Sequence, residues 1–516
     1  MFSKKRALVA TAAATAIALL AGCSGGSSDT DSSTGATSGG ETVSGGTLTI
    51  ATATPPTSLS AQNTGFGSES LYTQAVYDSL LRAEPDGTIS PHLATEWSWS
   101  EDRLTLTMQL RDDVTFTDGE AFNADVAAQN VLRFRDGTSS NASWLSRVAD
   151  AQATGDYELT ITMTEPDPSL EWYLTMNAGM QESPAAFDSP DVETTPVGSG
   201  LYVLNTDETV VGTTYVYDKN PDSWMPEEQY YDKLVLNLYA DSSALINAIQ
   251  GGQVNAGLIN DTTTVPQAEA AGFSMVQYEL DYQGLLLMDR DGTLAPELAD
   301  VKVRQAINMA FDREALVDAF VSGYGTPTTQ IWPVTSSSFD ESLDSYYSYD
   351  PEGAKALLAE AGYPDGFTLS MPSSSAFPTQ IFPLIQQQLA DIGITAEYTD
   401  LAIGDFINDM IGAQYPAAFM QLQQDPTDWQ IATFELTPEA IFNPFRVEDE
   451  TVAELVDRIQ QGDEAAGAEL NTYVVEQAWF APFYRMTTNF AVDGSTTAEA
   501  QTGNVYPYIW NIKPAA

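Results

Sequence analysis

Cysteine and histidine are nearly absent from this chain of 516 residues, which holds one of each, Cys23 and His92. One cysteine cannot close a disulfide within the chain. Zinc, nickel and copper sites are built from several thiolate and imidazole ligands, which this composition does not provide. We therefore expect no disulfide framework, no metal site made of protein ligands and no cofactor.

Basic residues are also scarce. The sequence has 20 Lys and Arg against 72 Asp and Glu, a formal net charge of -52. Binding to nucleic acid needs clustered Lys and Arg side chains, so we expect no nucleic-acid partner. The acidic residues are spread along the chain and form no tail. This pattern indicates a strongly hydrated surface, whose self-repulsion a saline medium would screen.

Long apolar runs are lacking, apart from one near the N-terminus. Residues 7–21 are mostly apolar, follow three basic residues at positions 4–6 and precede Cys23. Such a run is too short to span a bilayer and is typical of an export signal, here residues 1–22. Residues 20–23, LAGC, resemble the bacterial lipobox. That resemblance implies cleavage before Cys23 and lipid on its sulfur and amino group; the alternative is an ordinary secreted protein with a chance cysteine.

Residues 23–44 are rich in Ser, Gly and Thr and poor in apolar side chains. Such a segment cannot bury enough surface to offset the entropy lost on ordering, so we predict a flexible tether. No later stretch reaches the roughly 18 apolar residues of a transmembrane helix. We expect the body of the protein to be extracytoplasmic, anchored to the outer face of the cell membrane by lipid on Cys23.

The rest of the chain predicts α/β domains. Hydrophobic residues make up 43% of the sequence, which is enough for large cores. Residues 104–110 and 157–163 alternate apolar and polar side chains, as half-buried strands do. Residues 351–361 predict a helix with Asp350 as its N-cap and Pro351 at its first position. In the later half, helical segments alternate with short β-branched runs.

Several phrases, in order along nearly the whole chain after residue 45, resemble the extracytoplasmic solute-binding proteins of family 5. This is the peptide and nickel group that serves ATP-driven importers. In LRDDVTFTDGEAFNADV at 110–126, the chain follows the family pattern in which "L-R-x-x-V-x-F-x-D-G" precedes "A-x-D-V". The other phrases are YDSLLRAEPDGTISPHLATEW at 77–97, PVGSGLY at 196–202, VRQAINMAFDREALVDAFVSGYGTP at 303–327 and DPEGAKALLAEAGY at 350–363. Their order and spacing identify the chain as a member of that family.

The resemblance implies a two-lobed α/β fold of the periplasmic-binding-protein type, in which two crossing strands form a hinge and the lobes enclose the ligand. The N-terminal lobe would cover residues 45–282, with an inserted α+β subdomain near 75–194. The C-terminal lobe would cover 283–484, and residues 485–516 would return to the first lobe. Lobe closure then distinguishes the loaded protein from the empty one. The implied partners are a small-molecule or peptide ligand and an ABC permease complex; we expect a monomer that catalyses nothing.

The ligand is expected near residues 419–430, FMQLQQDPTDWQ. Peptide-binding members read approximately "W-x-A-D-Y-x-D-P" here. Alignment on Asp425-Pro426 puts Leu422 where those members carry the aspartate that pairs with the peptide α-amino group. A buried ammonium without a carboxylate carries a penalty of roughly several kcal/mol. Asp425 could take this role if the loop is shifted, and its alternative interpretation is a cap before Pro426.

Amide and indole side chains in the same region suit a ligand with peptide groups or hydroxyls and an apolar face. The resemblance adds Asn443, the pair Phe483-Tyr484 and, from the other lobe, Phe66. The complete set of candidate ligand-binding residues is Phe66, Trp332, Gln421, Leu422, Gln423, Gln424, Asp425, Trp429, Asn443, Phe483 and Tyr484. The two tryptophans of this set have a second interpretation as residues of lobe packing.

Three classes of ligand stay open: oligopeptides first, oligosaccharides as the alternative, and chelated metals held through outer contacts. From another class of function, a surface-anchored hydrolase would need His92 in a Ser-His-Asp set, and no G-x-S-x-G motif accompanies it. DRDG at 289–292 is similar to the start of a calcium-binding loop, but the later Asp, Asn and Glu ligands of such a loop are missing. We therefore expect a turn there.

Overall fold

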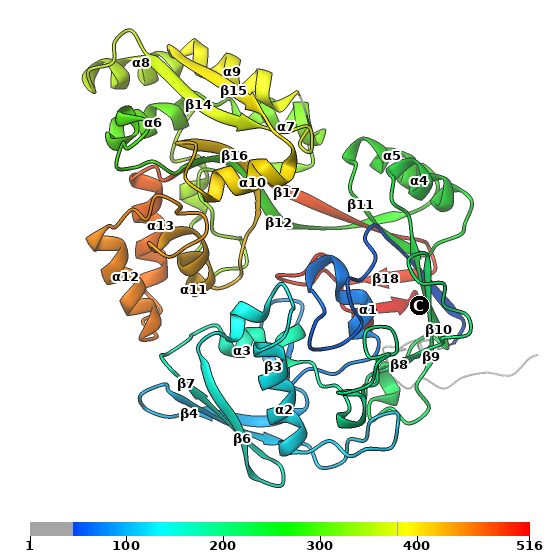
Figure 1. Ribbon diagram of the computed structural model, residues 1–516. Helices are drawn as coiled ribbons and strands as arrows, with labels where there is room; N and C mark the ends of the chain where they lie inside the picture. The colour runs from blue at the N-terminus through cyan, green and yellow to red at the C-terminus, as the bar shows by residue number, and fades with distance from the viewer. Residues whose placement is uncertain (1–44, 379) are drawn as a thin grey trace, which may run out of the picture. The chain divides into compact units, whose positions relative to one another are not determined.

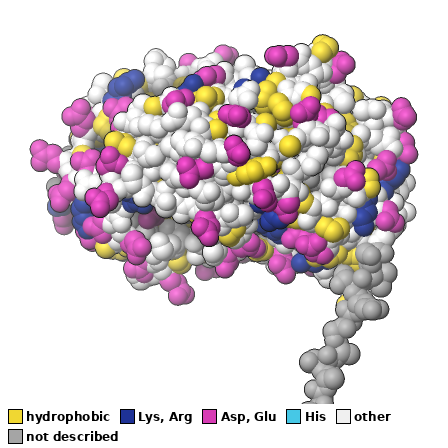
Figure 2. Space-filling model, turned by 90° about the horizontal axis from the view of Figure 1, so that it is seen from below, with side chains coloured by type: hydrophobic (Ala, Val, Ile, Leu, Met, Phe, Trp, Pro, Cys, Tyr) yellow, Lys and Arg dark blue, Asp and Glu magenta, His cyan; other side chains and the backbone are white. Residues whose placement is uncertain are grey.

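The computed structural model describes residues 45–378 and 380–516. The predicted signal peptide, the tether and Cys23 lie outside the described residues. Within them, no helix is long and apolar enough to cross a membrane. Acidic side chains are spread over the face seen in Figure 2, with fewer basic ones between them.

The largest sheet is mixed and has the strand order β16-β12-β17-β11-β1-β10-β9-β8, with β13 paired to β17. Its strands are β1 (Thr47–Thr52), β8 (Tyr202–Leu204), β9 (Thr214–Lys219), β10 (Lys233–Leu238), β11 (Ala256–Ile259), β12 (Ser274–Leu287), β13 (Gly325–Pro327), β16 (Ala417–Gln423) and β17 (Phe480–Val492). The long strands β12 and β17 pair antiparallel along most of their length. They connect the part of the sheet that contains β16 with the part that contains β11 and β1 (Figure 1).

These two long strands are where the sequence predicts the hinge. Tyr282 lies opposite Arg485 and Gln283 lies opposite Tyr484, so the predicted boundaries 282/283 and 484/485 face each other across the ladder. The division into lobes at these residues stays a prediction.

A separate antiparallel sheet has the order β4-β5-β7-β6, and α2 packs against it. Its elements are β4 (Ala94–Trp99), β5 (Thr105–Leu110), β6 (Val148–Gly155), β7 (Glu158–Met163) and α2 (Ala124–Arg135). The strands predicted at 104–110 and 157–163 are confirmed as β5 and β7. In β5 the buried side chains alternate with less buried ones, so one face meets the helix and the core.

The segment between β12 and β17 is mainly helical, with one parallel pair of strands. It contains α6 (Val301–Met309), α7 (Arg313–Val321), α8 (Pro351–Glu360), β14 (Phe367–Ser373), α9 (Ile381–Asp391), β15 (Ile394–Asp400), α10 (Ile403–Ile411), α11 (Asp428–Ile431), the π-helix η9 (Ala432–Leu436), α12 (Glu450–Gln460) and α13 (Ala466–Glu476). The predicted helix at 351–361 is confirmed as α8. Asp350 accepts a hydrogen bond from the Gly353 N–H, the N-cap contact that the sequence predicts.

Shorter elements complete the description. They are α1 (Ser70–Gln74), β2 (Leu81–Ala83), β3 (Ile89–Pro91), α3 (Leu170–Tyr173), α4 (Ser242–Gln250), α5 (Val265–Ala270), β18 (Thr496–Ala498), β19 (Ile512–Pro514) and the 3₁₀ turns η1 (Gly67–Glu69), η2 (Ala142–Leu145), η3 (Asn177–Gly179), η4 (Pro184–Ala186), η5 (Pro226–Glu228), η6 (Thr262–Thr264), η7 (Pro296–Ala299), η8 (Glu341–Ser345) and η10 (Ile509–Asn511). DRDG at 289–292 forms a turn, in which the Asp289 carboxylate accepts backbone N–H groups of residues 293–295.

Separate apolar cores occupy the two sides of the β12–β17 ribbon. One core is built from residues before β12 and from the last part of the chain, including Tyr506 and Tyr508. Two others are built from residues 282–484. The chain after β17 therefore packs with the residues that precede β12.

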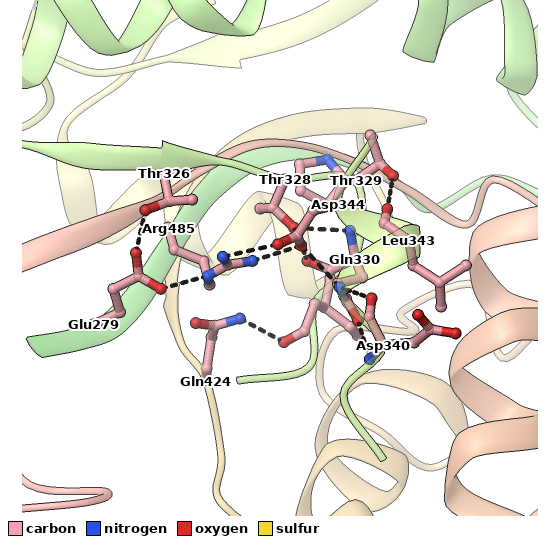
Figure 3. A network of polar contacts seen from close by, with 12 residues as sticks. Glu279, Thr326, Thr328, Thr329, Gln330, Asp340, Leu343, Asp344, Gln424 and Arg485 are labelled. Carbon is pink, nitrogen blue, oxygen red and sulfur yellow. Dashed lines mark hydrogen bonds and ion pairs between the residues drawn. The ribbon is translucent and has the colours of Figure 1, made fainter. Parts of the chain in front are cut away.

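A buried ion cluster joins the two long strands to the 328–344 segment (Figure 3). Arg485 of β17 is 2% exposed. Its guanidinium lies 2.5 Å from a Glu279 oxygen on β12 and 2.6 Å from Asp344 Oδ1. Asp344 also accepts hydrogen bonds from Thr328 Oγ1 at 2.7 Å and Gln330 Nε2 at 2.8 Å. One guanidinium thus neutralises two carboxylates from different segments at the predicted hinge.

We predict that Arg485→Leu lowers the free energy of unfolding by about 3–5 kcal/mol, because it leaves Glu279 and Asp344 without a cation in a largely buried place. Arg458 is a matched control, because it also meets two carboxylates, Asp463 and Glu469, but on the surface. Arg458→Leu should have a much smaller effect. Urea unfolding of both variants checks this, and equal losses would contradict the prediction.

Candidate ligand-binding site

A cavity of about 270 Å³ lies between residues of the first core and the segment 422–442. On one wall it is lined by Phe66, Gly67, Ser140, Asn141, Trp144, Trp172, Met176 and Gly503. On the other wall it is lined by Leu422, Gln423, Asp425, Pro426, Gln430, Phe434, Glu435 and Phe442. Aromatic rings, amides and two carboxylates therefore share one enclosed space.

The second wall is a strand, a turn and a helix in succession. β16 ends at Gln423, and Asp425-Pro426 makes the turn. Thr427 caps α11 by accepting a hydrogen bond from the Gln430 N–H. The helix then continues as the π-helix η9, which carries Phe434 and Glu435. A π-helical turn is rare and frequently occurs at functional sites.

The first wall is made of short helical turns. Trp144 belongs to η2 and Trp172 to α3, and the Trp144 ring stacks on Tyr173 at a centroid distance of 5.2 Å. Trp172 is 5% exposed, and its indole Nε1 has no hydrogen-bond partner among the described residues. Because an indole N–H donates only, this buried atom lacks the acceptor that such a group usually has.

Both ionisable groups of the lining are acidic. Glu435 is 2% exposed and accepts a hydrogen bond from the Tyr282 hydroxyl at 2.7 Å. Burial, with a further contribution from the charge of Asp425, raises the pKa of Glu435 to about 8. Burial also raises the pKa of Asp425 to about 7. Within residues 45–378 and 380–516, no Lys, Arg or His lines this cavity. The cavity is therefore complementary to a positive charge.

Contacts around the cavity join its two walls. The Ser169 and Thr427 hydroxyls lie 2.6 Å apart, and Gln460 Nε2 donates to the Pro166 carbonyl at 3.0 Å. The Arg147 guanidinium lies 5.0 Å from the centre of the Trp429 ring. The structure therefore has the two walls in direct contact, as a ligand-enclosing arrangement requires.

Gly503 completes this rim. Gln423 Nε2 donates to its carbonyl at 3.4 Å. Its φ is +69°, and a Cβ atom there would lie 2.9 Å from the Trp172 ring and 3.2 Å from Pro426. Only glycine suits this place, because the residue has a left-handed conformation and both walls approach its backbone.

Four of the candidate residues line the cavity: Phe66, Leu422, Gln423 and Asp425. Leu422 contributes an apolar side chain to the lining, and Asp425, three positions later, contributes a carboxylate. Asp425 has no hydrogen bond or ion pair with any other described residue. Its interpretation as a ligand contact stays a prediction, to which this geometry is favourable.

The other seven candidates, Trp332, Gln421, Gln424, Trp429, Asn443, Phe483 and Tyr484, do not belong to the lining of this cavity. The Trp332 indole N–H donates to Asp428 at 2.8 Å. Asn443 is fully buried, and its side-chain amide donates to the Leu436 and Thr437 carbonyls. Phe483 packs on Phe311 within the second core.

The three remaining polar candidates bond to the protein itself. Gln421 donates to Asp281 at 2.6 Å, Gln424 to the Ile331 carbonyl at 2.9 Å, and the Tyr484 hydroxyl to Gln283 at 2.5 Å. The ligand contacts of all seven remain untested predictions.

The sequence analysis missed Trp144, Trp172, Phe434 and Glu435. A signal for Glu435 was present, because it is a single acidic residue in the otherwise apolar or neutral segment IATFEL. The two tryptophans have no such signal, since they lie more than two hundred residues from the segment that they face.

We predict that the two raised pKa values make the ligand-free protein less stable as the pH rises from about 4 to about 8. In this range the folded protein binds more protons than the unfolded chain, so the stabilisation present at low pH is lost as the carboxyls ionise. The double variant Asp425→Asn/Glu435→Gln mimics the protonated groups. Its gain in Tm over the unchanged protein should be larger at pH 8.5 than at pH 5.

Glu439→Gln is the control for this pH measurement, because Glu439 is exposed and lies outside the cavity lining. Its effect on Tm should change little with pH. A difference between the double variant and the unchanged protein that is the same at both pH values would contradict the prediction.

Known proteins share both the sequence pattern and the fold. Residues 88–437 match the family described as bacterial extracellular solute-binding proteins, family 5. The glutathione-binding protein GsiB of Escherichia coli O1:K1 is 28% identical over 373 residues, which are 70% of each chain.

Two solved structures have the same fold. HbpA2 from Haemophilus parasuis matches with a TM-score of 0.81 at 22% identity, over 91% of this chain and 100% of its own. DppA from Helicobacter pylori, in complex with the peptide STSA, matches with a TM-score of 0.74 at 22% identity, over 92% and 99%. The predicted two-lobed α/β fold is confirmed.

Members of this family bind solutes and are not enzymes, so the hydrolase alternative is wrong. The match covers most of the chain, on both sides of β12. The chain belongs to the family 5 bacterial extracellular solute-binding proteins and is the substrate-binding component of an ABC importer.

Proposed function

We propose that this protein captures short oligopeptides in the cavity between the two walls, with the peptide α-amino group at Asp425. The observation that carries the proposal is a cavity in which, among the described residues, the ionisable side chains of the lining are the carboxylates of Asp425 and Glu435 and none is basic. An α-ammonium supplies the charge that the lining lacks.

The other lining groups suit the remainder of a peptide. Trp172 contributes an indole side chain whose N–H has no acceptor among the described residues. The amides of Asn141 and Gln430 offer both donors and acceptors, and Phe66 and Trp144 offer apolar surface. Ligand pockets commonly combine a mainly apolar lining with a few placed polar groups.

The size of the cavity favours a short ligand. Its volume of about 270 Å³ lies just below the range of about 300–1,000 Å³ that is usual for ligand pockets. Two of the similar proteins are consistent with small peptidic ligands: GsiB is a glutathione-binding protein, and DppA was solved in complex with the peptide STSA. A long peptide would need the walls to separate further.

Capture would proceed by closure of residues 45–282 and 485–516 onto residues 283–484 about β12 and β17. The contacts across the rim, such as that between Ser169 and Thr427, would then be made in the closed form. A ligand shifts this equilibrium only by its differential affinity for the closed form. The permease partner would recognise that form.

An oligosaccharide is the competing ligand, since amides and indoles also suit hydroxyl-rich molecules. A neutral sugar would leave the charges of Asp425 and Glu435 uncompensated, whereas an amine neutralises one of them. Peptides are therefore the better match.

We predict that a pool of two- to four-residue peptides raises the Tm and that a pool of neutral oligosaccharides does not. A ligand at a hundredfold excess over its Kd stabilises the folded protein by about 2.7 kcal/mol. Asp425→Asn should weaken peptide binding by about tenfold or more, because it removes the charged partner of the ammonium. The N-acetylated forms of the same peptides are the matched control, and equal binding of free and acetylated peptides would refute the role of Asp425.

We further infer that lipid on Cys23 holds the protein at the outer face of the cell membrane. The basic start, the apolar run and the LAGC sequence at 20–23 support this. Two or more acyl chains give stable anchoring, whereas a single chain gives marginal binding.

Cys23→Ala should therefore move the protein from the membrane fraction of the cells to the medium or the soluble extracytoplasmic fraction. Mass spectrometry of the N-terminal peptide of the unchanged protein should show cleavage before Cys23 and added acyl mass. Equal membrane retention of the variant, or an unmodified Cys23, would contradict the lipid anchor.

A further inference from the structure

Several buried or half-buried carboxylates elsewhere in the described part of the chain have partners that compensate their charge. Asp344 pairs with the Arg485 guanidinium at 2.6 Å, and the fully buried Glu182 has the Arg133 guanidinium at 3.9 Å. The fully buried Asp289 accepts three backbone N–H groups. The scaffold thus follows the rule that a buried charge needs a cation or several donors.

The buried Glu435 and the half-buried Asp425 depart from that rule. Tyr282 donates to one Glu435 oxygen, Oε2, and the other oxygen has no hydrogen bond from the described part of the chain. Asp425 has neither a donor nor a cation there. None of the Lys and Arg residues that the structure describes lines this cavity. Two negative charges are therefore left for something other than the protein to neutralise.

Two independent features mark this place as one built for a ligand. Trp172, which is 5% exposed, lines the same cavity with an indole N–H that has no acceptor among residues 45–378 and 380–516. Phe434 and Glu435 lie on the π-helix η9 and both line the cavity. Such π-helical turns are rare and frequently occur at functional sites.

One α-ammonium can neutralise one of the two carboxylates. The second must then stay protonated or meet a second cation. Aromatic rings at the cavity wall, among them Trp144 and Phe434, suit the aliphatic stem of a basic side chain and attract its charged head. The lining is thus complementary to two positive charges on one ligand.

We propose that Glu435 is a second cation subsite beside Asp425, so that the cavity selects peptides whose first residue carries a basic side chain. This inference rests on the proposed capture of peptides and adds a specificity to it. Asp425 would take the α-amino group and Glu435 the side-chain cation. Glu435 thereby becomes the residue that determines which peptides are taken up.

The test compares two tripeptides by isothermal titration of the purified full-length protein in detergent at pH 8 and low salt. Lys-Ala-Ala and norleucine-Ala-Ala have side chains of similar length, and only the first has a second cation. Lys-Ala-Ala should bind about tenfold tighter or more. Glu435→Gln, which keeps an acceptor for Tyr282, should remove this preference. Glu439→Gln, the same change in charge four residues away and outside the cavity, should keep it.

Each outcome separates this inference from the proposed function. Equal affinity for the two peptides, or a preference that persists in Glu435→Gln, overturns the second subsite and leaves peptide capture intact. If neither peptide binds, peptide capture is wrong. In that case 1,5-diaminopentane, a dication without peptide groups, still tests the subsite: binding that Glu435→Gln abolishes supports it, and absence of binding overturns it as well.

Discussion

Compensation of buried negative charge is the constraint on which both the scaffold and the site of this protein depend. The chain has 72 acidic and 20 basic residues, so most carboxylates must lie in water and few cations are available inside. Arg485 serves two carboxylates at once where the long strands pass between the cores. Cations are also scarce at the cavity, where Asp425 and Glu435 have no cationic partner among the described residues. We propose that the ligand supplies the positive charge there.

The candidate site and the predicted hinge are linked through one strand. β12 carries Glu279, which meets Arg485, and three residues later Tyr282, which donates to Glu435 in the cavity wall. A rotation of the strands at the ion cluster would therefore move Tyr282 and with it the hydrogen bond to Glu435. Glu435 is the carboxylate that we propose binds the second positive charge of the ligand. The proposed closure and the proposed charge recognition would therefore both depend on β12.

Local patterns predicted the local elements well. The alternation at 104–110, the N-cap at Asp350 and the turn at 289–292 all depend on neighbours within a few residues, and each is found in the structure. The crossing strands and the two-lobed fold came from the family resemblance. The cavity could be predicted only in part, through Asp425 and its neighbours, because its other wall comes from Phe66, Trp172 and Gly503.

The candidates that lie outside the cavity lining show a physical limit of sequence patterns. A tryptophan such as Trp332 can either stack on a ligand or fill a core, and the sequence does not reveal that Asp428 accepts its N–H. Amides such as Gln424 likewise find partners within the protein. By contrast, the isolated Glu435 in an apolar segment could have indicated a residue of the cavity lining, because a carboxylate in an apolar segment is costly to bury.

The position of β17 in the large sheet has a consequence for the order of folding. This strand lies between β12 and β11, although it follows both of them by about two hundred residues of chain. Until residues 480–492 have been made and exported, the facing edges of β11 and β12 lack their central partner, and Gly503 is not yet available to close the cavity. Such long-range pairing is slow, and open strand edges invite association with other chains. The protein acquires its ability to bind solute late, after the chain that carries β17 has reached the same compartment as the rest of the sheet.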